Sequence, residues 1–171
     1  MALRIENVVS DIKTYMQSRY ETELNDVTTA TDTSLLLPEP RPENYFIGEP
    51  NQYKPYVVPA VFLVDNTTTR PGEHTADDFG IYDHQVDRLW LGIRIEERTE
   101  ERLTKMCWRY ARAADQCLHN AEVSTSADYT AHVYVVRVEY GAMLMDRDTN
   151  RFQKDVRLSL EIDIVDSLTM G

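Results

Sequence analysis

The segment 156–164 constrains the fold most, because apolar and polar residues alternate in it without interruption. Its apolar positions are Val156, Leu158, Leu160, Ile162 and Ile164, and those between them are Arg157, Ser159, Glu161 and Asp163. A period of two puts the two sets on opposite sides of an extended chain, so the pattern predicts a strand with one buried and one polar face. Such strands are typical of antiparallel sheets covered on one face only.

A second alternating segment, Ala131 to Met145, precedes it. Here Val133 and Val135 are expected to face away from a second set, namely Tyr134, Val136, Val138 and Tyr140. Asp146-Arg147-Asp148-Thr149-Asn150 separates the two strands and is rich in turn-forming residues. The turn begins like a calcium-binding loop, but Arg151 stands where that loop needs glycine. We therefore expect a closing β-hairpin.

Two helices and two further strands complete the predicted fold. Apolar residues recur at helical spacing in 3–24 and again in 99–121, where Thr99 is suited to cap the helix. Short strands are expected at 57–64 and 88–97, with Pro59 at a sheet edge or near the start of the first. The order α-β-β-α-β-β predicts an α+β fold, a mainly antiparallel sheet packed by two amphipathic helices.

A chain of 171 residues suits a single domain, 1–171, with two long irregular segments. One is a Pro-rich extended arm at about 25–56, since six of the seven prolines lie between Pro38 and Pro59. Leu35, Leu36, Leu37, Tyr45 and Phe46 are its candidate anchors. The other is a polar loop at about 65–87 with six acidic residues and one arginine.

Composition excludes several classes of function. Eighteen basic and twenty-nine acidic residues give a net charge of −11, which disfavours autonomous nucleic-acid binding and attachment to anionic lipid. The apolar runs are far shorter than the roughly 20 residues of a membrane span, and nothing resembles a signal peptide. Two cysteines make no disulfide framework, and Cys107 and Cys117 read as small core residues.

The sequence also gives no enzyme signal. Nucleotide-binding, zinc-protease and nucleophile-elbow motifs are absent, so no catalytic residue, cofactor or metal ligand is assigned. His74, Asp77, Asp78, His84 and Asp87 could surround a metal, but their spacing fits no established ligand pattern. A solvated acidic loop is the better interpretation.

Charge is distributed unevenly along the chain. Projection of the second helix at 100° per residue places five basic residues on one stripe, opposite its apolar face: Arg98, Arg102, Lys105, Arg109 and Arg112. Both the stripe and the acidic loop could simply be solvated. In a ring of identical subunits, the stripe of one copy could instead contact the acidic loop of the next, with Asp77, Asp78 and Asp83 as partners. A third possibility is that the stripe faces passing nucleic acid.

The layout resembles that of the tail terminator family of tailed bacteriophages. The likeness lies in the N-terminal helix from Ile5 to Leu24, the strand Tyr56-Val57-Val58-Pro59-Ala60-Val61-Phe62, the strand 88–97, the helix 99–121 and the hairpin 133–164. It covers most of the chain as an order of elements, without an invariant motif. The arm and the acidic loop are larger than the minimal family layout.

The resemblance implies a non-enzymatic virion protein that assembles in the host cytoplasm. The expected assembly is a ring of six copies. The ring would cap the tail tube, stop its polymerisation and dock head–tail connector or neck proteins, while DNA passes through its lumen without specific binding. The arm, the 65–87 loop and the tip of the hairpin at 141–155 are the expected contact elements. Alternatives are a head–tail stopper or neck completion protein, a metal-dependent enzyme using the His74–Asp87 loop, and an acidic inhibitor that mimics DNA.

Overall fold

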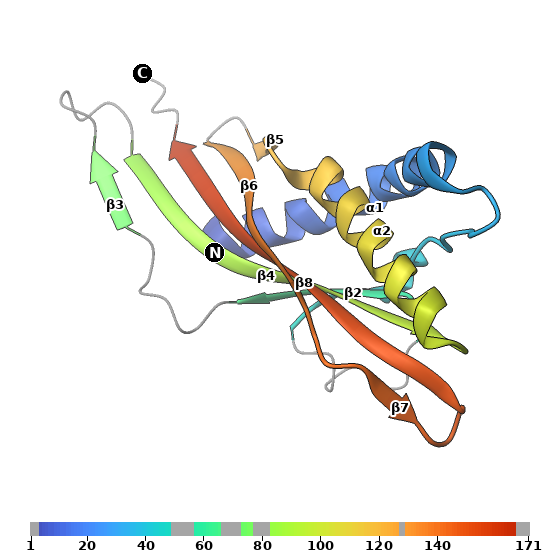
Figure 1. Ribbon diagram of the computed structural model, residues 1–171. Helices are drawn as coiled ribbons and strands as arrows, with labels where there is room; N and C mark the ends of the chain where they lie inside the picture. The colour runs from blue at the N-terminus through green and yellow to red at the C-terminus, as the bar shows by residue number, and fades with distance from the viewer. Residues whose placement is uncertain (1–3, 49–56, 66–72, 77–82, 127–128, 167–171) are drawn as a thin grey trace.

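The computed structural model describes residues 4–48, 57–65, 73–76, 83–126 and 129–166. Within these ranges, two helices cover one face of an eight-stranded sheet (Figure 1). The elements are α1 (Arg4–Thr31), a 3-10 turn (Pro42–Asn44), β1 (Tyr45–Ile47), β2 (Ala60–Asp65), β3 (Glu73–Ala76), β4 (Asp83–Glu97), α2 (Glu100–Leu118), β5 (Ala121–Ser126), β6 (Tyr129–Tyr140), β7 (Leu144–Asp146) and β8 (Arg151–Asp166). The predicted α+β class is confirmed, and neither described helix is long and apolar enough to span a membrane.

Strands β4 and β8 form the centre of the sheet. Its order is β1-β2-β4-β8-β6-β5, with β3 added beside β4 and β7 beside β8; β1 pairs in parallel with β2, and the other pairs are antiparallel. The five alternating apolar side chains of β8 are at most 1% exposed and face the helices. The alternation in the sequence therefore identified the buried face correctly.

Helix α1 is longer than predicted. The apolar pattern continues past Leu24 to Val27, which is 1% exposed, and the helix ends only at Thr31. Residues 25–31, assigned from sequence to the extended arm, are therefore helical. Their threonines do not break the helix, because the hydroxyls of Thr28 and Thr31 donate to carbonyl oxygens one turn earlier, at 2.8 and 2.7 Å.

The rest of the arm is held against the core. Leu35 and Leu37 are buried, whereas Leu36 between them is 67% exposed. The chain then forms the 3-10 turn, whose Pro42 carbonyl accepts from Gln17 Nε2 at 2.9 Å, and it enters β1 at Tyr45. Tyr45 is a buried anchor as expected, but β1 itself was missed, because a three-residue strand has too little pattern to detect.

Pro59 lies directly before β2, in agreement with a position near the start of a strand. The strand is not at the sheet edge, because it lies between β1 and β4.

The interpretation of 65–87 as one long loop is wrong. Residues 73–76 form β3, and β4 begins at Asp83, with Ala76 opposite Asp83 in the ladder. Backbone pairing supports β3 and the first residues of β4 without an apolar pattern in the sequence.

The predicted N-cap of helix α2 is confirmed, but the helix ends earlier than predicted. The Thr99 hydroxyl oxygen accepts from the Arg102 backbone N–H at 3.4 Å. At the other end, Asn120 has φ 60°, a left-handed conformation that terminates a helix. Ala121, which was placed on the apolar face of the helix, is instead the first residue of β5.

A bulge in β6 reverses the predicted facing of its second half. Val133 and Val135 pair with Ile162 and Leu160, but the next pair is Arg137 with Ser159. The extra residue, Val136, is 64% exposed. Beyond it, Val138 and Tyr140 stand opposite core-facing residues of β8, on the same face as Val133 and not the opposite one.

The hairpin turn is confirmed. Asp146 Oδ1 accepts from the Asp148 N–H at 2.9 Å, and Asn150 has φ 53°. The strand predicted from Ala131 to Met145 is interrupted at 141–143, so β6 ends at Tyr140 and β7 is a separate strand. The Gly141 N–H donates to the Asp155 carbonyl at 2.8 Å, which holds this interruption against β8.

Candidate interaction surface

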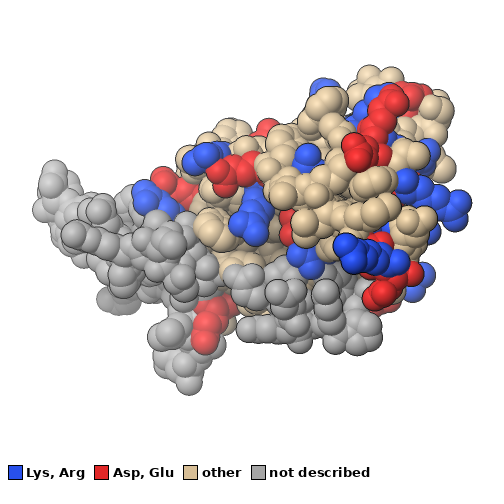
Figure 2. Space-filling model, turned by 60° about the horizontal axis from the view of Figure 1, so that its bottom comes forward, with Lys and Arg blue, Asp and Glu red and all other residues tan. Residues whose placement is uncertain are grey.

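Four residues of the basic stripe lie on α2 as projected from the sequence, whereas Arg98 precedes the Thr99 cap and lies outside the helix. The buried residues of the helix lie on one side, Leu103, Met106, Cys107, Tyr110, Ala111, Ala113, Ala114, Cys117 and Leu118. Of the stripe, Arg98, Arg102, Lys105 and Arg112 are exposed and Arg109 is half-buried. Figure 2 shows Lys and Arg side chains spread over the described part of one face, interspersed with Asp and Glu side chains and uncharged surface.

Much of the charge of the stripe is already paired within the chain. Arg102 Nε lies 2.9 Å from Glu97 Oε2, and Lys105 Nζ lies 2.6 Å from Glu101 Oε1. Arg109 donates to the backbone carbonyl of Asp32 at 3.2 Å, which ties the helix to the arm. Such exposed contacts contribute little to stability, so these cations remain available to a partner.

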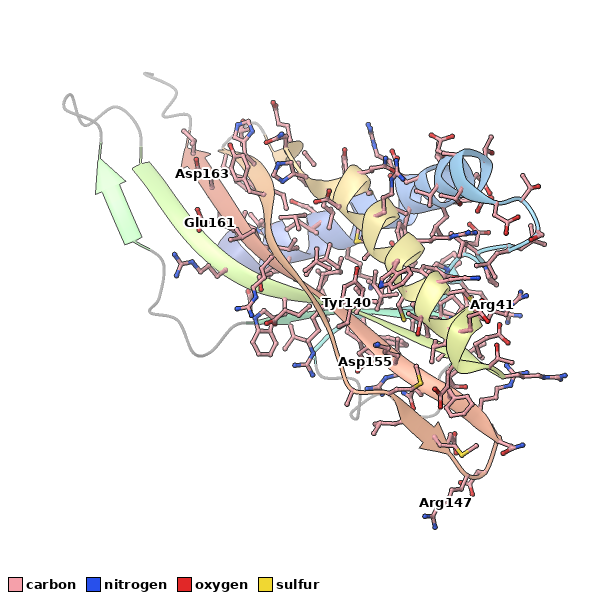
Figure 3. All side chains as sticks on the ribbon, in the orientation of Figure 1. Arg41, Tyr140, Arg147, Asp155, Glu161 and Asp163 are labelled. Carbon is pink, nitrogen blue, oxygen red and sulfur yellow. The ribbon has the colours of Figure 1, made fainter. Side chains whose placement is uncertain are left out.

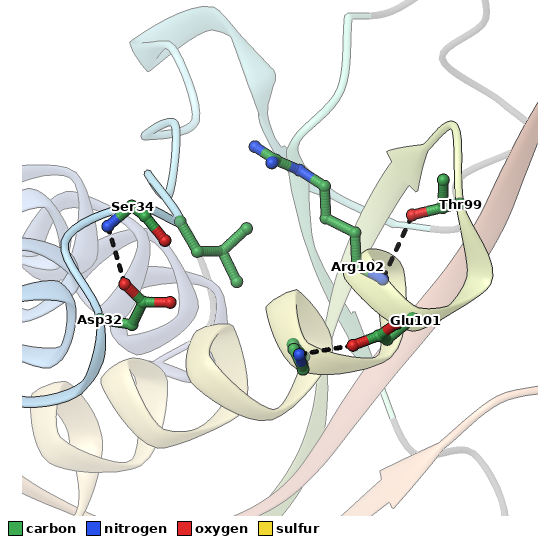
Figure 4. A pocket seen from close by; sticks show the side chains of 7 residues that line it. Asp32, Ser34, Thr99, Glu101 and Arg102 are labelled. Carbon is green, nitrogen blue, oxygen red and sulfur yellow. Dashed lines mark hydrogen bonds and ion pairs between the residues drawn. The ribbon is translucent and has the colours of Figure 1, made fainter.

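A polar depression lies where the arm meets the start of α2 (Figure 4). Asp32, Ser34 and Leu35 line it from the arm, and Thr99 and Arg102 from the helix. The Ser34 side chain and N–H hold the pKa of Asp32 below its usual value. At about 220 Å³, the depression is smaller than the roughly 300–1,000 Å³ typical of small-molecule sites.

The acidic residues proposed as partners of the stripe are only partly placed. Asp77 and Asp78 lie outside the described residues. Asp83 begins β4, on the strand that pairs with β3. In the described part of the chain, the stripe and these acidic positions are not brought together.

A second surface, which the sequence analysis did not identify, is apolar. We call it the apolar seam and define it by five exposed residues: Trp108, Val136, Tyr140, Leu144 and Met145. They are 57%, 64%, 43%, 62% and 53% exposed. The first three line a groove of about 340 Å³ between α2 and β6. Leu144 and Met145 follow in β7, the next strand along the same side of β8, where successive side chains point to opposite faces of the sheet. Exposed apolar side chains gathered in this way are typical of interaction sites.

The seam ends on a projecting hairpin. Strands β7 and β8 extend beyond the helices, and Arg147 lies at the tip, away from Tyr140 (Figure 3). The turn is exposed from Arg147 to Asn150. The hairpin tip was expected to be a contact element, and its exposed Leu144 and Met145 supply an apolar surface for such a contact.

Trp108 could have been found from the sequence by the same helical projection that revealed the stripe. At 100° per residue it falls between Arg112 and Asp115 on the solvent side of α2. The contribution of Val136 could not, because its exposure follows from the bulge. The seam is therefore a product of the tertiary structure.

The uncovered face of the sheet carries paired charges. The Arg94 guanidinium binds both carboxylate oxygens of Asp155, each at 2.8 Å, and the side chains are only 14% and 23% exposed. Arg157 lies over the ring of Trp90, 5.4 Å from its centroid. These contacts place charged groups beside the aromatic residues Phe62 and Trp90 on this face.

The two cysteines and His119 have structural surroundings in the part of the chain that the structure describes. No three His, Cys, Asp or Glu residues there are grouped as metal ligands. Burial raises the pKa of Cys107 to about 11 and that of Cys117 to about 12, so both thiols stay protonated at neutral pH. His119 Nδ1 accepts from the Val135 N–H at 3.2 Å, a contact that supports β6.

No protein-family model and no curated protein matches the chain. Among solved structures, a similar chain belongs to a structure described as "Virion of native gene transfer agent (GTA) particle". The two share 10% sequence identity, the match covers 86% of this chain and 94% of that chain, and the TM-score is 0.41. A likeness at this level does not by itself assign a function.

Proposed function

We propose that this chain is a structural virion protein, a tail terminator that forms a ring, caps the tail tube and stops its polymerisation. The observation that carries the proposal is the apolar seam, which runs along an open sheet edge onto a projecting hairpin. An isolated soluble subunit gains nothing from exposing Trp108, Val136 and Tyr140 together, whereas a subunit of an assembly buries them against a neighbour.

The protein would act by contact and without catalysis. The ring, a hexamer by the family resemblance, would join the tube to head–tail connector or neck proteins and lie in the tail or neck of the virion. DNA would cross its lumen without specific binding, because a net charge of −11 does not attract phosphate. The basic stripe and the acidic positions would contribute to contacts between neighbouring copies.

The direct test is electron microscopy of the purified protein mixed with its tube subunit and, separately, with neck proteins. We expect one ring at a single end of each tube, at a fixed number of copies, and tubes that stop growing. Binding to neck proteins alone, with tubes left uncapped, would indicate a head–tail stopper. Binding to neither would overturn the proposal.

Charge reversal at Arg109 tests the stripe. We expect Arg109→Glu to weaken ring assembly at physiological salt by about tenfold or more, since like charges at an interface oppose association. Its melting temperature should change little, because the hydrogen bond from Arg109 to the Asp32 carbonyl lies at the surface and contributes little to stability. Arg109→Lys is the matched control and should assemble normally. Normal assembly of Arg109→Glu would exclude an inter-subunit role for the stripe.

A further inference from the structure

The edge of the sheet beside the apolar seam is open. Strand β5 pairs with β6 only from Tyr129 to Val133, so in the described residues β6 has β8 as its sole strand partner from Tyr134 to Tyr140. Among the residues that the structure describes, strand β7 likewise pairs with β8 alone, on the side of β8 opposite β4. The seam thus follows an edge without a further strand partner in the described residues, where the Val135 N–H is bound by His119 Nδ1 and Arg137 pairs with Glu139 at 2.6 Å. Such an edge can still accept a contact from another chain.

Cations surround this edge. Residues 104–115 and 135–154 together hold seven basic and four acidic residues, a net charge of +3 in a chain of net charge −11. Arg112, Arg137 and Asp115 line the groove itself, and Arg137 is paired with the exposed Glu139 at 2.6 Å. Lys154 lies over the Tyr140 ring, 6.0 Å from its centroid. An occupant of the seam should therefore present an apolar side chain among acidic groups.

The chain carries such a surface at the end of α1 and on the arm. Residues 21–43 hold six acidic residues and one basic residue, Arg41, a net charge of −5. Leu36 is the exposed apolar residue there, at 67%. Two of the acidic groups lie close enough to affect one another: desolvation, the Glu21 charge and a hydrogen bond to Glu21 raise the pKa of the exposed Glu39.

Leu36 cannot reach the seam of its own chain. Leu35 and Leu37 on either side of it are buried in the core, the Tyr110 hydroxyl donates to the Pro38 carbonyl, and Arg109 holds the Asp32 carbonyl. The depression beside the arm and the groove of the seam share no residue. Figure 3 shows Arg41 of the arm and Arg147 of the hairpin well apart.

We propose that the apolar seam of one copy receives Leu36 and the acidic 21–43 surface of a second copy. The two surfaces differ, so the contact is heterologous, and repetition around an axis closes a ring. This inference rests on the proposed function and names the surfaces through which its subunits would join.

The test is a cysteine cross-link between copies. In the double variant Leu36→Cys/Val136→Cys, mild oxidation should produce a ladder of disulfide-linked multimers on a non-reducing gel. Each single variant should give no species larger than a dimer, and an equimolar mixture of the two should give heterodimers only. The native Cys107 and Cys117 are 1% and 4% exposed and do not interfere. Absence of the ladder would overturn the proposal.

A second pair of variants separates this contact from general solubility. We expect Val136→Glu to abolish self-association measured by sedimentation, whereas Val57→Glu, at another exposed valine, leaves it unchanged. Equal effects of both would contradict a role for the seam. If wild type caps tubes but the double cysteine variant forms no ladder on them, the pairing fails and the terminator role stands. A ladder without tube binding would mean that the pairing stands and the terminator role fails.

Discussion

Replacement of Tyr110 by alanine is expected to lower the free energy of unfolding by about 3–5 kcal/mol, since it removes a large, fully buried aromatic side chain. Tyr110 lies where α2, α1 and the arm meet. Its ring centroid is 6.4 Å from that of Tyr20, its hydroxyl donates to the Pro38 carbonyl, and its own carbonyl accepts from the Tyr20 hydroxyl at 2.9 Å. Urea denaturation followed by circular dichroism measures the loss.

The matched control is Tyr110→Phe, which keeps the ring and loses only the hydrogen bond to the arm. We expect it to cost about 1–2 kcal/mol, since the Pro38 carbonyl is left without this donor. A negligible effect of Tyr110→Ala would mean that α2 presents the opposite face to the core.

Raising the pH above about 9 is expected to destabilise the protein progressively through its buried thiols and phenols. Burial is the largest cause of a raised pKa at Cys107, Cys117, Tyr20, Tyr45 and Tyr110. An acid with a raised pKa keeps its proton in the folded state and releases it in the unfolded state. Stability is therefore complete below the unfolded values, 9.0 for cysteine and 10.0 for tyrosine, and falls above them.

The slope of the unfolding free energy against pH follows from the number of buried groups that ionise only on unfolding. Each one that ionises only on unfolding lowers the unfolding free energy by about 1.4 kcal/mol per pH unit. Urea titrations between about pH 8 and pH 11 measure the fall, which should reach several kcal/mol. Tyr45→Phe removes one ionisable group and should make the fall shallower above about pH 10, by roughly one group's share. A stability that stays flat to pH 11 would contradict the burial of these groups.

A local sequence pattern was sufficient wherever all residues on one side of a helix or strand are buried to the same degree. The alternation in 156–164 identified the core-facing residues of β8, and Thr99 identified the start of α2. Both signals are read within a few residues, because side-chain period and helix capping are local properties of the backbone.

The errors arose where partners distant in sequence decide the structure. The bulge at Val136 exists because β8 fixes the register on both sides of it, and it transferred Val138 and Tyr140 to the other face. Strands β1 and β3 are short or polar and form because β2 and β4 offer backbone partners. Their own sequences contain little that predicts them.

The candidate site divides in the same way. By itself, the sequence determined the α+β class, the buried face of the closing hairpin and the basic stripe of α2, because helical and strand periods follow from backbone geometry alone. Only the tertiary structure decided that β5 begins opposite Val133 and leaves the β6 edge beyond it without a strand partner in the described residues. It also decided that Trp108, Val136 and Tyr140 line one groove. The physical reason is that the exposure of a side chain depends on whether a segment distant in sequence packs over it, and a local sequence pattern contains no information about that packing.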